Sequence, residues 1–163
     1  MGWSLAGAAL WTLGEYLLHR LDMHGARGRG ATSREHQNHH ATVDVPVRSI
    51  GTWSGAAIVA VALGWWIHPA LGLGWLAAYG AYDALHRAIH ARAPAGAYGR
   101  LVRRHHLSHH FGLAGSNYGV TSPVWDIVFR TRSDPGVVRV PVAQAPPWLT
   151  AADPGYELVG GPR

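Results

Sequence analysis

Twelve histidines stand in this chain, and eleven of them fall into four short clusters: LLHRLDMHG, EHQNHH, ALHRAIH and RHHLSHH. The imidazole side chain binds iron, zinc, copper and nickel, so a gathering of histidines is a candidate metal site. The spacing of ten of them allows them to converge: His19, His24, His36, His39, His40, His86, His90, His106, His109 and His110.

Helical geometry explains why these spacings matter. Residues three and four apart lie on one face of an α-helix. Each His-x2-His-His motif, at 36–40 and at 106–110, is therefore predicted to converge on one point. His86 and His90, four apart, form a further pair on one helix face.

Two positions fit this rule poorly. His105 lies about 100° around a helix from His106, so we expect it to face away from the metal site. His19 and His24 are five residues apart, which is a poor spacing for a continuous helix. They can meet only if the helix ends between them, and Asp22 and Gly25 are compatible with such an end.

The number of histidines predicts more than one ion. A tetrahedral zinc site takes four ligands, whereas ten nitrogens are enough for two metal ions. Di-iron helical bundles commonly use Glu and Glu-x-x-His ligands, but the chain has only Glu15, Glu35 and Glu157, none of them in that motif. It has no cysteine, which excludes thiolate zinc and iron–sulfur sites. An all-nitrogen dinuclear site is therefore predicted.

The elements that position the clusters are apolar. Only 14% of the 163 residues are charged, against about 25% in an ordinary soluble domain. Residues 49–82 contain no Asp, Glu, Lys or Arg, and this run exceeds the roughly 20 residues of one membrane span. Because Pro69 interrupts it, we predict a helical hairpin, 49–66 and 70–91, beside a third apolar segment at 2–18. The fold expected is an all-α integral membrane bundle of about three apolar segments; the alternative is buried core helices of a soluble protein.

Charge predicts the orientation of this bundle. All 14 basic residues are Arg and the net charge is +5. They flank the apolar segments and avoid the 65–70 turn, so the positive-inside rule places 19–48 and 87 onward in the cytoplasm. An integral membrane location with the histidine clusters on the cytoplasmic face follows. Since the Arg residues form no single stripe, no nucleic-acid partner is expected.

The rest of the chain is less regular. A helix is predicted at 98–111, followed by a short mixed segment at 117–130. From Asp134 the chain is rich in proline, which predicts an irregular tail. The expected organisation is one domain at 1–133 and a tail at 134–163.

The four clusters, in this order, resemble the histidine motifs of the fatty acid hydroxylase/sterol desaturase superfamily. The resemblance covers about residues 15–132 and includes NYGVTSPVWDIVFRT at 117–131, which is similar to the segment after the last histidine motif of fatty acid hydroxylases. The compact size and HRAIHARAP also look like carotenoid ring hydroxylases of this superfamily.

The resemblance implies a membrane bundle with a cytosolic histidine-rich helical cap, in which the ten histidines bind two iron ions. Zinc can replace iron in purified protein. Residues 1–133 would form the catalytic domain of an O2-dependent oxidoreductase, which hydroxylates or desaturates a lipid from the bilayer, above all a fatty acyl chain. An external electron donor protein would supply two electrons.

The same resemblance implies supporting roles for four residues after the last cluster: Asn117, Tyr118, Trp125 and Asp126. Asp126 is a candidate to orient a ligand histidine by accepting its second N–H, a common arrangement around metals. Asp83 is a further candidate. The alternative for both aspartates is a helix cap or an Arg partner.

Three other functions remain open at this point. A carotenoid ring hydroxylase or a sterol desaturase would share the chemistry but not the substrate. A non-catalytic metal-binding membrane protein would share only the ligands. A zinc hydrolase is disfavoured, because the chain lacks His-Glu-x-x-His.

Overall fold

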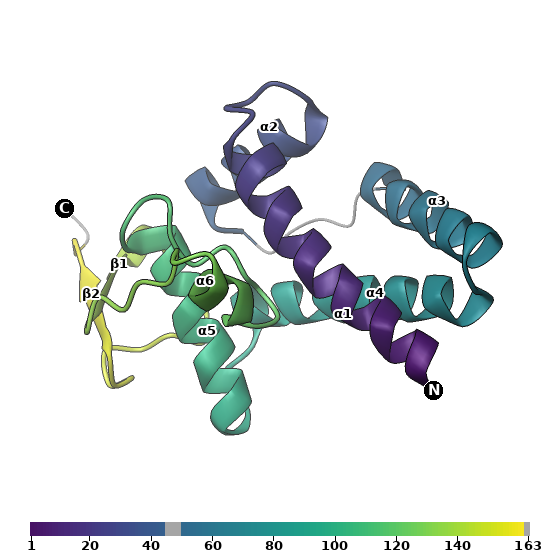
Figure 1. The fold of residues 1–163 in the computed structure, drawn as a ribbon. Coiled ribbons are helices and arrows are strands. Elements are labelled where there is room, and N and C mark those ends of the chain that lie inside the picture. The colour runs from purple at the N-terminus through teal and green to yellow at the C-terminus, as the bar shows by residue number, and fades with distance from the viewer. Residues whose placement is uncertain (45–49, 162–163) are drawn as a thin grey trace.

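The computed structural model describes residues 1–44 and 50–161 (Figure 1). Ser49, where the predicted hairpin begins, and the last two residues of the predicted tail lie outside them. The elements, in chain order, are α1 (Gly2–Leu17), the π-helix η1 (Leu18–His24), α2 (Ala31–Thr42), α3 (Ile50–Trp66), α4 (Pro69–Ala91), α5 (Gly96–Phe111), α6 (Val124–Val128), β1 (Val138–Pro141), the 3-10 turn η2 (Val142–Gln144) and β2 (Tyr156–Val159).

The predicted helical hairpin is present as α3 and α4 (Figure 1). Pro69 occupies the first turn of α4, where its missing N–H costs nothing. His68 precedes it and caps the helix, because its Nδ1 accepts from the backbone N–H of Ala70 at 3.1 Å. His68 also stacks on Trp3 of α1, with ring centroids 5.2 Å apart.

Helix α1 lies across α4, and small residues bring the two backbones close (Figure 1). A Cβ atom at Gly74 would run into the carbonyl oxygen of Ser4 in α1. A Cβ at Gly72 would meet the carbonyl oxygen of Ala60 in α3 in the same way. Trp11 fills the space beside these crossings, edge-on to Trp75 at 5.1 Å. This packing fixes the directions of α4, which carries His86 and His90, and of η1, which continues α1 and carries His19 and His24.

The prediction of an integral membrane bundle is wrong. Within the described residues, the structure has no helix that combines the length and the apolar character needed to cross a bilayer. A span takes about 20 apolar residues, whereas α1 has 16 residues and α3 has 17. Helix α4 has 23, but its second half carries Asp83, Arg87 and two histidines. The predicted integral membrane location, with the histidine clusters on the cytoplasmic face, depended on that bundle and is wrong for the same reason.

The tail is also more regular than predicted, and the fold is not all-α. Strands β1 and β2 pair in parallel, with Val138 opposite Tyr156. The buried side chains of Val138, Val140 and Leu149 cluster around Leu107 of α5. Proline-rich sequence is therefore compatible here with a small sheet, because apolar residues between the prolines are buried against α5. The division at residue 133 stays a prediction.

Candidate metal centre

The structure brings all ten predicted histidines together, in two groups of five. The first group takes residues from η1, α2 and α5, and the second from α2, α4 and α5. In each group one ring nitrogen per residue lies within 4.8 Å of all the others. The first group is His19, His24, His36, His40 and His109, and the second is His39, His86, His90, His106 and His110.

Each His-x2-His-His motif is divided between the two groups, contrary to the prediction that it converges on one point. His36 and His40, four apart, share the first group, while His39 belongs to the second. With 3.6 residues per turn, a residue three positions on is rotated about 60° one way and a residue four positions on about 40° the other way. The motif therefore faces two points, and α5 repeats this arrangement with His109 in the first group.

His19 and His24 converge without the predicted helix end between them. The chain from Leu18 to His24 continues from α1 as a π-helix, and the two rings lie 5.2 Å apart. In an α-helix, residues five apart would differ by about 140°. The wider π turn, hydrogen-bonded from residue i to i+5, brings them to one side; such turns are rare and often mark functional sites.

The nitrogens in each group have the spacing of metal ligands. Neighbouring Nε2 atoms lie 2.9–3.1 Å apart. Two ligands at right angles, each about 2.1 Å from a metal, are separated by about 3.0 Å. The donor set thus fits one metal ion in each group.

Backbone carbonyls hold two rings of the first group at Nδ1, the ring nitrogen that faces away from the group. His19 Nδ1 donates to the carbonyl oxygen of Tyr118, and His109 Nδ1 donates to that of Ser116 at 2.7 Å. A carbonyl can only accept, so the proton of each neutral ring is on Nδ1. The Nε2 lone pairs therefore point into the group, where a cation would stabilise them.

The surroundings keep these imidazoles neutral. Burial lowers the pKa of every histidine in both groups, and neighbouring imidazoles lower most of them further. The pKa falls to about 4 for His39 and to about 3 for His40 and His90. All ten can therefore offer a lone pair at neutral pH, as metal binding requires.

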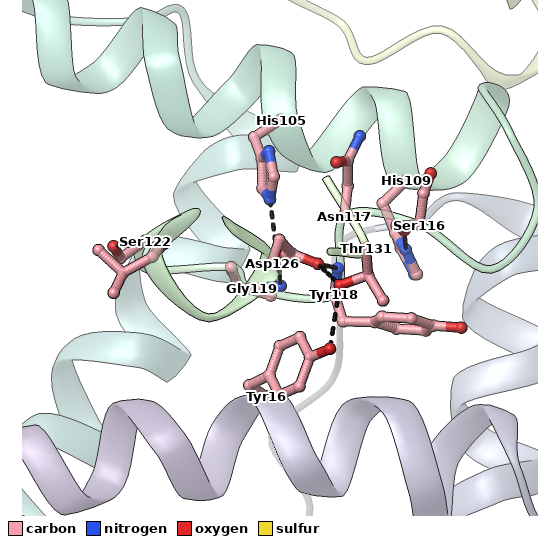
Figure 2. Close-up of polar contacts among 12 residues, drawn as sticks. Tyr16, His105, His109, Ser116, Asn117, Tyr118, Gly119, Ser122, Asp126 and Thr131 are labelled. Atoms are coloured by element: carbon pink, nitrogen blue, oxygen red, sulfur yellow. Dashed lines mark hydrogen bonds and ion pairs between the residues drawn. The ribbon is translucent and has the colours of Figure 1, made fainter. Parts of the chain in front are cut away.

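Asp126 lies beside the loop that carries Tyr118 (Figure 2), and none of the ten histidines is among its hydrogen-bond partners in the described residues. Its carboxylate accepts from His105 at 2.9 Å, from the amides of Tyr118 and Gly119 at 2.8 Å, and from the Thr131 hydroxyl at 2.7 Å. Burial would raise the pKa of Asp126, but these hydrogen bonds outweigh it and lower the pKa. Its role is thus to hold His105 and the loop whose Tyr118 carbonyl supports His19.

The other predicted supporting residues surround the same loop or α4. The side chain of Asn117 exchanges two hydrogen bonds with the backbone of Ser133, at 2.8 and 2.9 Å. Trp125 donates its indole N–H to Thr12 of α1 at 3.0 Å. Asp83 lies half-buried on α4, one turn before His86, and its effect on a ligand stays a prediction.

Sequence reasoning missed Glu15. This carboxylate is 3% exposed and lies on α1. Its Oε1 accepts from the amides of Val120 and Thr121 at 2.6 and 2.8 Å, and its Oε2 accepts from the Thr121 hydroxyl at 2.8 Å. Burial raises the pKa of Glu15 to about 7, although the hydrogen bonds oppose that shift. The sequence did contain a signal for it: Glu15 is the only charged residue in the apolar segment 2–18 and precedes His19 by four positions.

An open, mostly apolar groove lies between α1 and α4. Its volume is about 300 Å³. The α1 side supplies Ala8, Ala9, Trp11 and Thr12, the α4 side supplies Ala78, Ala81 and Leu85, and Tyr98 and Thr121 complete the lining. Thr121 is the residue that Glu15 holds, so the groove borders the loop behind the first group.

Fold and centre together define a helical protein in which two groups of histidines could each hold a metal ion. The family model for fatty acid hydroxylases matches residues 4–131, and the chain belongs to the fatty acid hydroxylase family. This confirms the resemblance found in the histidine motifs.

Curated relatives agree with the family. Two dihydroceramide fatty acyl 2-hydroxylases of Arabidopsis thaliana are 31% and 32% identical to this chain over 138 and 137 residues, 77% of it. A fatty acid 2-hydroxylase of Rattus norvegicus is 28% identical over 150 residues, 80% of the chain. The matched regions span 58% of the Arabidopsis proteins and 39% of the rat protein. No solved structure matches the chain.

Proposed function

We propose that this chain is a hydroxylase of fatty acyl chains that uses O2, two iron ions and electrons from an external donor protein. The observation that carries the proposal is the convergence of ten neutral imidazoles in two groups of five. The family match and the names of the relatives support the substrate class. Since those relatives are named for position 2, carbon 2 of the acyl chain is the position to test.

The reaction has a simple balance. One acyl C–H bond and one O2, with two electrons and two protons, become one C–OH bond and one water. Iron supplies the activation of O2 when it is bound. The two groups match that role chemically, because imidazole is a good iron ligand and ten of them leave the ions without a protein carboxylate.

The residues of the chain position and protect the centre. Buried rings such as His106 exclude water around the groups, which favours attack on substrate over side reactions. Tyr118 and Ser116 keep His19 and His109 in the tautomer that presents Nε2. The apolar groove between α1 and α4 has the chemistry to hold an acyl tail beside the loop behind the first group.

The proposal can be tested with a matched pair of histidine variants. Lipids from cells that produce wild-type protein should gain one oxygen atom in their acyl chains, at carbon 2, only when O2 is present. His109→Ala should abolish this product and lower the iron bound to the purified protein. His68→Ala should leave both unchanged, because His68 caps α4 at the end remote from the groups. Full activity in His109→Ala would contradict the ligand assignment.

The rival functions give different results in the same experiment. Acyl chains lacking two hydrogens, instead of gaining an oxygen, would indicate a desaturase. Oxygen added to a sterol or carotenoid, with acyl chains unchanged, would assign another substrate. Tightly bound metal with no product under reducing conditions would favour a non-catalytic metal-binding protein.

A further inference from the structure

The C-terminal tail follows the part of the chain that the family model covers, which ends at residue 131. It nevertheless packs against the helices that carry the histidines (Figure 1). Val138, Val140 and Leu149 are at most 6% exposed and pack around Leu107, which is fully buried. Leu107 directly follows His106 in α5. The tail is therefore anchored behind one ligand helix of the second group.

The tail also bonds to the backbone of the other two helices of the second group. Gln144 donates its side-chain N–H to the carbonyl oxygen of Ala41 at 2.8 Å. Ala41 lies at the C-terminal end of α2, directly after His40 of the first group and two residues after His39 of the second. Trp148 donates its indole N–H to the carbonyl oxygen of Ile89 in α4, also at 2.8 Å. Ile89 directly precedes His90, so each bond lies beside a ligand.

Arg103 extends this connection from α5 to the end of α4. Its guanidinium donates to the carbonyl oxygens of Ala88 and Arg92, at 3.0 and 2.8 Å, and Trp148 packs over it with the ring centroid 5.8 Å away. A positive charge is favourable at a helix C-terminus, where carbonyl groups lack helical partners. Trp148 and Arg103 together tie α5, α4 and the tail into one contact.

The two groups differ in how the rings that α5 contributes are held. In the first group, loop carbonyls accept from the Nδ1 atoms of His19 and His109. In the second group, the Nδ1 atoms of His106 and His110 are buried with no hydrogen-bond partner among residues 1–44 and 50–161. The positions of these rings therefore depend on where the helix backbones lie. Whatever fixes α2, α4 and α5 relative to one another fixes the second group.

We propose that the tail is a clamp for the second metal site, with Gln144 and Trp148 as its positioning residues. The proposal rests on the proposed function, in that it requires the groups to bind metal. It assigns the two sites separate supports: the loop after α5 holds the first group, and the tail, which acts through the helix backbones, holds the second. Loosening the clamp should weaken the second site more than the first, because α4, which Trp148 contacts, contributes ligands only to the second group.

The test measures iron bound per chain, after anaerobic loading of the full-length protein with limiting ferrous iron. The main variant combines Gln144→Ala with Trp148→Phe, which removes both donated hydrogen bonds and keeps an aromatic ring over Arg103. Gln144→Ala alone is a milder variant that loses only one surface contact. The control is Arg139→Gln, which breaks the exposed Arg139–Glu157 pair in the same small sheet without touching a ligand helix.

We expect wild type and Arg139→Gln to bind two ions per chain and the double variant to bind one. The second site should weaken by about 10-fold or more, as is typical when the support of metal ligands is removed. Adding His109→Ala to the double variant should remove the remaining ion, whereas adding His106→Ala should not. Gln144→Ala should shift the second site in the same direction by a smaller factor.

The outcomes separate the two proposals. Equal loss from both groups, or two ions retained in the double variant, would overturn the clamp while leaving the proposed function intact. Gln144→Ala, which is the milder change, guards against a general loss of structure in the double variant: equal loss from both groups in Gln144→Ala as well confirms that the clamp is overturned. A wild-type protein that binds no iron would overturn the proposed function and the clamp with it.

Discussion

Replacing Asp126 by Asn should destabilise the protein strongly, although the two side chains have the same shape. One oxygen remains, so the Tyr118 amide and the Thr131 hydroxyl keep their acceptor. The new NH2 group replaces the oxygen that accepts from Gly119 and His105. A buried N–H left without an acceptor costs about 1–3 kcal/mol. With the loss of the buried partner of His105, we expect the free energy of unfolding to fall by about 3–5 kcal/mol.

The assay is urea unfolding of the metal-free protein at neutral pH, followed by circular dichroism. The matched control is Asp134→Asn, which removes an exposed ion pair with Arg104 and should cost at most about 1 kcal/mol. Because the loop carrying the Tyr118 carbonyl would also shift, the first site should bind iron about 10-fold more weakly. A loss of unfolding free energy no larger than that of the control would refute this account of the buried carboxylate.

Three further predictions follow from the packing and the buried titratable groups. Gly72→Ala should lower the unfolding free energy by about 1–3 kcal/mol, because its Cβ would meet the Ala60 carbonyl. Gly80→Ala should raise the unfolding free energy by about 0.5–1 kcal/mol, because its Cβ would make an ordinary 3.5 Å contact with Trp53. Thermal melting of the two variants and wild type compares them. Glu15 has a folded pKa of about 7 against an ordinary 4.5, so the folded state retains a proton that the unfolded state loses. Wild type should therefore lose about 3 kcal/mol relative to Glu15→Gln as the pH rises through that interval, and a constant difference in urea unfolding at about pH 5 and about pH 8 would count against it. The histidine groups work in the opposite direction: their pKa lies below the ordinary 6.5, so the metal-free protein should lose stability, and the loaded protein should release iron, as the pH falls below about 6.5. Iron release that increases towards alkaline pH would contradict this.

The gathering of the ten histidines could be predicted because it depends largely on local spacing. Residues such as His86 and His90 share a helix face whatever surrounds the helix, and Pro69 marks the hairpin turn through its own backbone. How a motif divides between two points depends on where the neighbouring helices lie, so the separation of His39 from His36 required the structure. The π turn at Leu18–His24 is a hydrogen-bonding choice that the residue pattern does not reveal.

The remaining differences concern contacts between distant parts of the chain. Glu15 binds amides more than 100 positions away, and no local spacing indicates Val120 as its partner. The membrane prediction counted apolar residues along the chain instead of along helices. The run at 49–82 divides into α3, which has 17 residues, and the first half of α4, so neither helix has the required apolar length.

Two of the four ligand-bearing segments serve both metal groups, and two serve only one. Helices α2 and α5 each contribute to both, whereas η1 belongs to the first group alone and α4 to the second alone. A displacement of η1 or α4 would thus disturb the histidines of one group only. A displacement of α2 or α5 would disturb histidines of both groups at once, so these two helices set the distance between the groups.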